Sequence, residues 1–491
     1  MIESRGSVDS VGDVLRAAGL LREARGPGDV AVMGVCQDSR EAEPGDVFFA
    51  WKGVGMDAHN FVGQAADRGA VAAVVERFVN VDMPQLLVED GRRAAAIGAS
   101  AIMGSPSNDM FMVGVTGTNG KSTTAMLVRH LLQQRGQAAA IGTLGLVDDS
   151  GVRPGTEALT TPGPVQVAVW LWQLADGGME AVVIEASSHA LEQHRLDGTH
   201  FDVGVFTNLT QDHLDYHKNI AGYFGAKARL VELVAPNGTL VVNGDDPAWA
   251  ALDTRGRSVT TYAVDAHADV RAEKVRLSAD GSSFDLVVNG ATREVALPLL
   301  GRYNVENALA AAAVGAEYGL DIDQLAAGLS TVPQVSGRLE AVVTSPFSVL
   351  IDFAHTADAL DGVLAAVRPL ASGRLIVVFG AGGDRDAGKR RPMAEAVARF
   401  ADVIVLTSDN PRTEDPERIL DDLAEGLENH DYSRIVDRRE AIRHALDAAE
   451  NGDTVVLAGK GHETYQVLGT EKRPFDERLI VHECLSELGV A

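Results

Sequence analysis

The stretch FMVGVTGTNGKSTTAMLV (residues 111–128) places a short apolar run, a glycine-rich turn and a helical pattern in direct succession. An apolar strand that leads through a glycine turn into a helix is typical of phosphate-binding units in α/β proteins. The spacing departs from the common nucleotide loop, which has Gly, four residues, and then Gly-Lys-Ser/Thr. Counting back from Gly120, the first glycine belongs at Val115, whereas Gly114 lies one place early and Gly117 two places late.

A second glycine loop competes for the same role. GDRDAGKR (383–390) has the expected spacing but ends in Arg390, where a nucleotide loop needs the hydroxyl of Ser or Thr. In the first loop, Lys121 can reach a β- or γ-phosphate and Ser122 can ligate Mg²⁺, beside the positive end of a helix. We therefore predict that the first loop binds the nucleotide.

Apolar runs alternate with helical segments along the rest of the chain. In 123–136, Leu127 and Leu131 lie at helical spacing, and Gly136 is a suitable stop. This alternation predicts parallel, doubly wound sheets. The expected strands are 45–53, 71–76 and 84–90, then 111–117, 181–187, 203–209 and 239–246, then 348–355, 374–383, 402–410 and 454–463.

A chain of 491 residues is too long for one core, so several domains are expected. SPSND (105–109) reads as a linker, and Asn289-Gly290 predicts a hairpin within an antiparallel patch on the second domain. The predicted fold is α/β with three domains: a smaller N-terminal α/β domain, a central P-loop-type doubly wound sheet, and a Rossmann-like C-terminal domain. The expected boundaries are 1–107, 108–333 and 334–491.

The composition of the chain narrows the range of possible functions. The net charge of −26 disfavours a nucleic-acid partner. Cys36 and Cys484 are too few for a disulfide framework, and neither a signal peptide nor a membrane-spanning run is evident. A cytoplasmic protein without a membrane association is predicted.

Polar residues follow two of the expected strands in the second domain. Glu185 ends an apolar run, where a carboxylate is costly unless it is paired or bound to metal. TNLTQDHLDYH (207–217) concentrates metal-ligand chemistry in Asp212, His213, Asp215 and His217. Because both segments end strands of one sheet, we expect Glu185 and His213 to converge near a γ-phosphate. Lys227, on a helix, would by its chemistry alone be a solvated side chain.

The third domain offers both signs of charge at its strand ends. Arg385 and Asp409-Asn410-Pro411-Arg412 follow two strands, and Gly459-Lys460-Gly461-His462-Glu463 follows another. Arginine suits carboxylate capture, and a glutamate suits an ammonium. This pattern predicts a site for a zwitterion such as an amino acid.

Five stretches resemble segments of the Mur ligase family and occur in the same order. They are GVTGTNGKST (114–123), EASSHALEQHR (185–195), TNLTQDHLDYH (207–217), GRYNVENALAA (301–311) and SGRLEAV (336–342). The resemblance covers nearly the whole chain. It implies an ATP-dependent, amide-forming ligase of peptidoglycan precursor synthesis. Within the family, DNPR (409–412) resembles the signature of members that add meso-diaminopimelate to UDP-MurNAc-L-Ala-D-Glu.

The resemblance also implies roles for individual residues, with Lys121, Glu185, His213 and Lys227 as the catalytic set. ATP would be bound by Gly117, Thr118, Asn119, Gly120, Lys121, Ser122, Thr123, Asn304, Arg338 and Asp352. UDP-MurNAc-dipeptide would be bound by Ser39, Thr160, Thr161, Ser187, Gln193 and Arg195. Diaminopimelate would be bound by Arg385, Asp409, Asn410, Pro411, Arg412, Gly459 and Glu463. One or two Mg²⁺ ions would be held by Ser122, Glu185, His213 and Lys227, the last as a carbamate.

Departures and alternatives remain. The family usually has Tyr and Pro where this chain has Phe353 and Ala357. A lysine-adding or D-alanyl-D-alanine-adding ligase is the alternative within the family. Outside it, a P-loop regulatory ATPase that forms no amide is the alternative. A monomer whose domains close around the substrates is expected.

Overall fold

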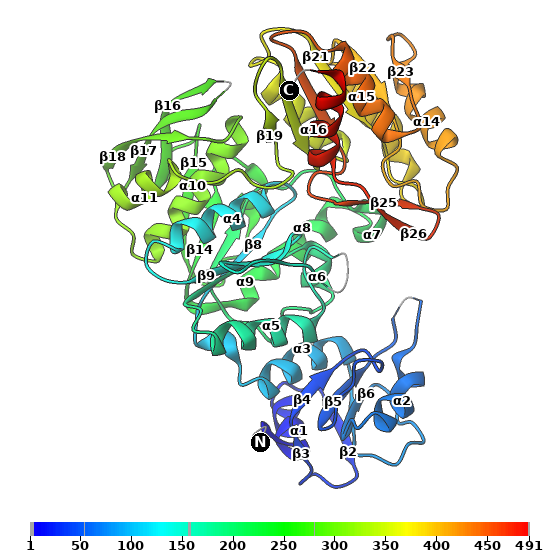
Figure 1. Ribbon diagram of the computed structural model, residues 1–491. Helices are drawn as coiled ribbons and strands as arrows, with labels where there is room; N and C mark the ends of the chain where they lie inside the picture. The colour runs from blue at the N-terminus through cyan, green and yellow to red at the C-terminus, as the bar shows by residue number, and fades with distance from the viewer. Residues whose placement is uncertain (1–3, 54, 156–158, 279, 490–491) are drawn as a thin grey trace.

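A computed structural model describes residues 4–53, 55–155, 159–278 and 280–489, without the side chain of Asp215. Three α/β parts follow one another from the N-terminus (blue) through the middle (cyan to green) to the C-terminus (yellow to red) (Figure 1). Each part is built on its own sheet. The predicted three-domain α/β fold is confirmed, while the proposed boundaries after residues 107 and 333 stay predictions.

The N-terminal domain has a five-stranded sheet in the order β2-β7-β6-β5-β4. β2 pairs antiparallel with β7, and the remaining neighbours are parallel. Helices α1 and α3 pack on one face, and α3 also contacts α5 of the central domain. The bounds are β2 Leu21–Arg25, β4 Gly34–Cys36, β5 Asp46–Ala50, β6 Ala72–Val75, β7 Gln85–Val88, α1 Val8–Ala17, α2 Val62–Asp67 and α3 Gly91–Ile102.

The central domain has an eleven-stranded sheet with β8 between β12 and β13. The strands from β9 to β15 in the sheet order pair in parallel, and β16, β17 and β18 continue as the antiparallel patch expected around Asn289-Gly290. The bounds are β8 Phe111–Thr116, β9 Ala138–Gly142, β10 Gly145–Asp148, β11 Gly151–Arg153, β12 Ala181–Glu185, β13 Phe201–Phe206, β14 Val234–Asn243, β15 Ser258–Ala263, β16 Val270–Ser278, β17 Gly281–Val288 and β18 Ala291–Leu297.

Helices cover both faces of this sheet, which explains why its strands read as continuous apolar runs. Residues of α4 and α10 share one apolar core with the sheet, and residues of α5 and α9 share the other. The bounds are α4 Lys121–Leu132, α5 Pro164–Asp176, α6 Ser188–Glu192, α7 Leu214–His217, α8 Ile220–Ala228, α9 Leu230–Leu233, α10 Arg302–Glu317 and α11 Ile322–Leu329.

The C-terminal domain has a six-stranded sheet in the order β19-β20-β24-β21-β22-β23, parallel except for β19. Because their strands run the same way, the loops that follow β20, β21, β22 and β24 leave the sheet at one edge. The bounds are β19 Glu340–Val343, β20 Ser348–Asp352, β21 Leu375–Phe379, β22 Val403–Leu406, β23 Ser433–Arg434, β24 Thr454–Ala458, β25 Tyr465–Leu468, β26 Glu471–Pro474, α12 Ala357–Val367, α13 Arg390–Ala398, α14 Pro416–Ala424, α15 Arg438–Ala448 and α16 Glu477–Leu488.

The helix expected over 123–136 differs at both ends. α4 begins two residues earlier, at Lys121, so the lysine and serine of the loop belong to its first turn. It ends at Leu132 and does not continue to Gly136. The N–H groups of Gln134 and Arg135 bond three residues back, which tightens the chain into a final turn outside the α-helix.

Within the described ranges, none of the helices is long and apolar enough to cross a membrane.

Candidate active site

The loop between β8 and α4 requires glycine at two positions. Gly117 has φ +148° and Gly120 has φ +84°, which L side chains rarely adopt. A Cβ at Gly117 would lie 1.8 Å from Thr207 Oγ1, and a Cβ at Gly120 would lie 2.4 Å from Asn307 Oδ1. The helix then begins without a side-chain cap, as is typical of helix N-termini that bind anions.

The neighbouring strand end holds this loop in shape. The N–H groups of Thr118 and Asn119 donate to the backbone and side-chain oxygens of Asn208, each at 2.8 Å. Thr207 returns a hydrogen bond from its hydroxyl to the Asn119 carbonyl at 2.7 Å. Thr123 is buried in the first turn of α4. The displaced glycine spacing therefore belongs to a loop that is fixed by the segment TNLT (207–210).

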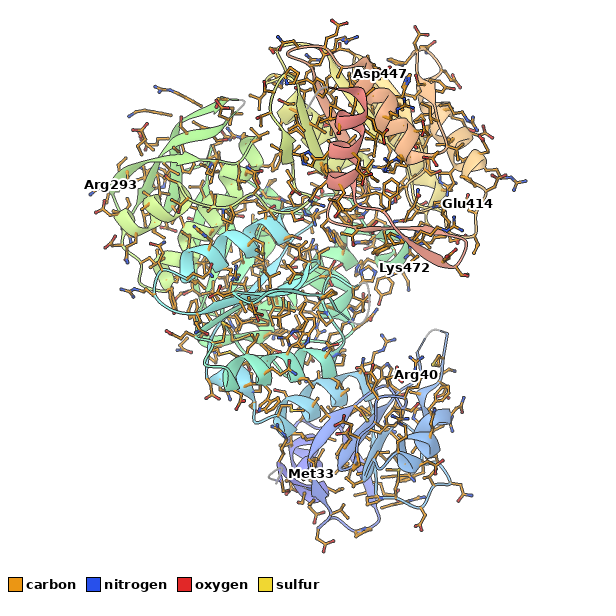
Figure 2. All side chains as sticks on the ribbon, viewed as in Figure 1. Met33, Arg40, Arg293, Glu414, Asp447 and Lys472 are labelled. Atoms are coloured by element: carbon orange, nitrogen blue, oxygen red, sulfur yellow. The ribbon has the colours of Figure 1, made fainter. Side chains whose placement is uncertain are left out.

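The competing loop at 383–390 is fixed differently. Arg390 is buried, and its guanidinium bonds to Glu414 at 2.6 and 2.7 Å and to Asp422 at 2.8 Å. Figure 2 shows Glu414 in the C-terminal domain. An ion-pair cluster thus occupies the place where a nucleotide loop has its metal-binding hydroxyl, which argues against nucleotide binding here.

Lys121 lies inside the first loop. Its ammonium donates to the carbonyls of Gly117 at 3.0 Å and Thr118 at 2.7 Å. Burial lowers the pKa of Lys121, and the nearby carboxylates of Glu185 and Asp212 oppose this effect. The loop therefore holds a cation where nucleotide phosphates would be bound.

Glu185 is buried beside the loop and has hydroxyl neighbours. Ser122 Oγ donates to Glu185 Oε2 at 3.0 Å, and the Thr143 N–H and hydroxyl donate to the two carboxylate oxygens at 2.9 and 3.1 Å. Gly142 has no room for a side chain, since a Cβ there would lie 2.1 Å from Glu185 Oε1. Thr143 was not among the predicted residues, although a polar residue directly after a buried strand is the signal that pointed to Glu185.

Lys227 is 1% exposed, on α8, and is not the solvated side chain that chemistry alone suggests. Its ammonium donates to the Gly117 carbonyl at 2.6 Å and lies 4.4 Å from the centre of the Tyr223 ring. Burial, and next the charge of Lys121, lower the pKa of Lys227 well below its ordinary value. The position therefore favours a neutral, nucleophilic amine.

His213 belongs to an aromatic group of three histidines and two tyrosines. Its ring lies 4.7 Å from His189 and 6.4 Å from Tyr223, and Tyr223 also stacks on His217 at 5.2 Å. Within the described residues, no group of three or more His, Cys, Asp or Glu side chains is placed to hold a metal ion. The structure pairs Ser122 with Glu185, and it places Tyr223 beside both His213 and Lys227. The predicted metal site stays a prediction.

Arg338 links the C-terminal domain to the nucleotide loop. Its Nη2 donates to Ser122 Oγ at 3.0 Å, and its guanidinium lies 4.8 Å from the Phe353 ring. Asp352 is buried and accepts two backbone N–H groups at 2.7 Å, while burial raises its pKa. Phe353 also stacks on two histidine rings, so the phenyl ring itself is well packed without the hydroxyl of the usual Tyr.

Asn304 and Asn307 connect α10 to α4. Asn307 Nδ2 donates to Asn304 Oδ1 at 3.1 Å, and Thr124 Oγ1 donates to Asn307 Oδ1 at 3.1 Å. Asn307 was missed by the sequence interpretation, although it lies in the quoted stretch NVEN. Its i,i+3 spacing from Asn304 was the available signal.

The central-domain residues predicted to bind UDP-MurNAc-dipeptide form one network. Thr161 Oγ1 donates to the Glu185 carbonyl at 2.6 Å and bonds to Ser187 Oγ at 3.0 Å. Arg195 donates to the Thr161 carbonyl at 2.7 Å and to Gln193 Oε1 at 2.9 Å. Thr160 joins the Glu185 group through the Thr143 hydroxyl at 3.3 Å.

Ser39 lies apart from this network, in the N-terminal domain. Its hydroxyl donates to Gln64 Oε1 at 2.8 Å. Figure 2 shows its neighbour Arg40 on the side of this domain that faces the rest of the molecule. A substrate that reaches both sites has to span two domains.

The two charged loops of the C-terminal domain are packed together. Asn410 Nδ2 donates to Glu463 Oε2 at 2.9 Å, and Lys460, 0% exposed at its side chain, donates to the same oxygen at 2.9 Å. A Cβ at Gly459 would lie 2.5 Å from Asp409 Oδ2. Glu463, predicted to hold an ammonium, thus already faces the ammonium of Lys460.

Arg412 and Arg385 border these loops. Arg412, which directly follows Pro411, has φ +53°. Its guanidinium donates to the Gly383 carbonyl at 2.8 Å. Arg385 lies in the exposed part of its loop. The loop that carries Arg385 and the DNPR segment are therefore in contact.

A further contact joins the domains across the nucleotide loop. Asp358, in the first turn of α12, accepts from Asn119 Nδ2 at 3.0 Å and from Thr210 Oγ1 at 2.8 Å. Sequence reasoning did not find Asp358, because its partners lie far away along the chain. With Arg338, it brings the C-terminal domain against the N-terminal end of α4.

Comparison with known proteins gives two family matches. Residues 115–315 match the Mur ligase middle domain, and residues 337–461 match the Mur ligase glutamate ligase domain. Together these matches cover more than half of the chain.

Several relatives that match over nearly the whole chain are named for one reaction. A UDP-N-acetylmuramoyl-L-alanyl-D-glutamate--2,6-diaminopimelate ligase of Geobacter sulfurreducens is 44% identical over 475 residues, covering 91% of this chain and 93% of the relative. Its namesake from Geobacillus kaustophilus is 41% identical, covering 94% and 96%. A solved structure of a ligase with this name is 31% identical, covers 100% of both chains and has a TM-score of 0.69. MurF from Acinetobacter baumannii, 20% identical with a TM-score of 0.68 over 93% and 96% of the chains, shares the fold.

Proposed function

The chain belongs to the Mur ligase family, and from this premise we propose that it adds meso-diaminopimelate to the D-glutamyl γ-carboxylate of UDP-MurNAc-L-Ala-D-Glu. The reaction consumes ATP and forms an amide in peptidoglycan precursor synthesis. The observation that carries the proposal is the near full-length similarity, at 37–44% identity, to ligases named for this reaction.

In the first step, the γ-carboxylate oxygen attacks the γ-phosphorus of ATP. A bond forms between that oxygen and phosphorus, the bond to the β-phosphate oxygen breaks, and ADP leaves with the electron pair. Such transfers depend mainly on positioning and on neutralising charge. Lys121, the first N–H groups of α4 and Arg338 supply positive charge around the phosphate position.

The donor set beside the loop fits Mg²⁺. Ser122 and Glu185 present a hydroxyl and a carboxylate in direct contact, and oxygen ligands are those that Mg²⁺ prefers. We propose that Ser122, Glu185, His213 and Lys227 as a carbamate hold one or two ions. When bound, Mg²⁺ neutralises charge on the β- and γ-phosphate oxygens.

The surroundings of Lys227 support its proposed carbamylation. A neutral amine attacks CO₂, a C–N bond forms, and one proton is released, leaving a carbamate anion. Burial and the charge of Lys121 both favour the neutral amine. The anion would also offset the charge of Lys121 and give oxygen ligands beside Tyr223 and His213.

In the second step, a neutral amine of diaminopimelate attacks the acyl carbon of the resulting acyl phosphate. The C–N bond of the amide forms, the C–O bond breaks, phosphate leaves with the electron pair, and the amine nitrogen releases one proton to solvent. Asp409, Asn410, Pro411, Arg412, Gly459 and Glu463, with Arg385, are proposed to orient this amino acid. Thr160, Thr161, Ser187, Gln193 and Arg195, with Ser39, are proposed to hold the nucleotide-linked dipeptide. The protein is further proposed to act as a monomer. It is also proposed to lie in the cytoplasm, a reducing compartment in which its two free cysteines would stay reduced.

Arg412→Ala is expected to raise the KM for diaminopimelate far more than the KM for ATP. Cutting one partner of a buried charged contact costs about 2–5 kcal/mol, so a rise of at least about 30-fold is expected. The measurement is steady-state phosphate release with each substrate varied in turn. Equal effects on both KM values would contradict the role of Arg412.

Phosphate release that requires UDP-MurNAc-dipeptide and an amino acid together tests the proposal as a whole. Lysine or D-alanyl-D-alanine in place of diaminopimelate tests the alternatives within the family. ATP hydrolysis at the same rate with or without diaminopimelate, lysine or D-alanyl-D-alanine would favour a regulatory ATPase.

A further inference from the structure

An ion pair between Arg438 and Glu477 is completely buried in the C-terminal domain. Both side chains are 0% exposed, and Arg438 Nε lies 2.7 Å from Glu477 Oε1. Arg438 is the first residue of α15, where the positive end of the helix disfavours a cation. Removing both charges from water opposes folding unless their contacts compensate for the lost hydration. The position at the start of a helix therefore does not by itself favour a guanidinium here.

The remaining donors of Arg438 point to two loop origins. Nη2 donates to the Ala458 carbonyl at 2.9 Å, and Nη1 donates to the Ser408 carbonyl at 3.3 Å. Ser408 immediately precedes the segment 409–412, and Ala458 immediately precedes 459–463. In the sheet, β21 separates β22 from β24, so no strand pairing joins these two chain ends directly. Arg438 bonds to both chain ends.

The loops beyond these carbonyls leave little room for movement. Gly459 lies so close to the Asp409 carboxylate that a methyl group would not fit. Lys460 Nζ bridges Asn410 Oδ1 at 3.1 Å and Glu463 Oε2 at 2.9 Å. A shift of either loop origin therefore changes the placement of groups in both loops.

We propose that Arg438, held by Glu477, is a positioning residue that sets the separation of the loops 409–412 and 459–463. It thereby determines how tightly the incoming amino acid is bound and how well diaminopimelate is distinguished from lysine. This inference rests on the proposed function, in which these loops bind the amino acid. Arg438 itself touches no substrate.

Arg438→Met tests the inference beside a control that removes a more exposed ion pair of the same domain, Arg374→Met. Arg374 pairs with Asp453 at 2.7 Å and donates to the Ala448 carbonyl at 2.8 Å, at the opposite end of β24. Both variants are expected to lower the melting temperature. Only Arg438→Met is expected to raise the KM for diaminopimelate, by about 10-fold or more, with the KM for ATP changed less than about 2-fold. Its preference for diaminopimelate over lysine should also fall.

Two milder variants keep the test decisive if Arg438→Met does not fold. Glu477→Gln keeps the volume and one acceptor, and Arg438→Lys keeps the charge. Both should raise the same KM by a smaller factor. An unchanged KM for diaminopimelate in every folded variant, with wild type responding to diaminopimelate, would overturn the positioning role alone. If phosphate release by wild-type protein did not depend on diaminopimelate, the proposed function would be contradicted, and so would the positioning role.

Discussion

Lys121→Ala is expected to lower ADP formation by at least about 10²–10³-fold, the cost of removing one preorganised group that stabilises developing charge. The ammonium lies within the loop, against the Gly117 and Thr118 carbonyls, and near Glu185. No other lysine belongs to this loop. The measurement is single-turnover formation of ADP with saturating dipeptide substrate.

Lys389→Ala is the control for this prediction. Lys389 is the lysine of the second glycine loop, 383–390, which has the common spacing but ends in Arg390. The affinity for ATP should stay unchanged in this variant. Substantial ADP formation by Lys121→Ala, or loss of ATP affinity in Lys389→Ala, would contradict the assignment of the nucleotide to the first loop.

Lys227→Ala is expected to lose activity by at least about 100-fold. Loss of a group that merely orients a metal ligand costs about 10–100-fold, and the proposed carbamate is itself a ligand. Short carboxylic acids should restore part of the activity, because a small carboxylate fits the space of the deleted side chain. The measurement is phosphate release with and without added acetate or propionate.

Lys121→Ala is the matched control for the rescue. It removes a neighbouring cation and should gain nothing from a carboxylate. Mass spectrometry of native wild-type protein should also find CO₂ added at Lys227. An unmodified lysine together with no rescue would contradict carbamylation.

The sequence predicted the architecture because each domain repeats one local pattern. An apolar run, a polar or glycine-rich end and a helix are readable within about 20–30 residues of a βα unit, with no knowledge of distant contacts. Strand β8, the loop at 117–120 and the hairpin at Asn289-Gly290 were all found in this way. The length of α4 was not predicted, because the turn after the helix is formed by hydrogen bonds to the residue three places back.

The site was predicted unevenly for the same reason. Glu185 and Ser122 were both named, and they are in contact. Asn307, Asp358 and Arg438 were not, since their roles depend on partners from other elements. Burial is equally invisible in sequence: Lys227 looks like a surface lysine, yet it is among the most buried charged residues described.

The most direct test of the account is phosphate release from ATP by wild-type protein with UDP-MurNAc-L-Ala-D-Glu and one amino acid at a time. We predict release with meso-diaminopimelate, little with lysine or D-alanyl-D-alanine, and none when either the dipeptide substrate or the amino acid is omitted. The product should be the dipeptide substrate lengthened by one diaminopimelate through an amide. Release that is equal with and without an amino acid, or that is faster with lysine, would contradict the proposed function.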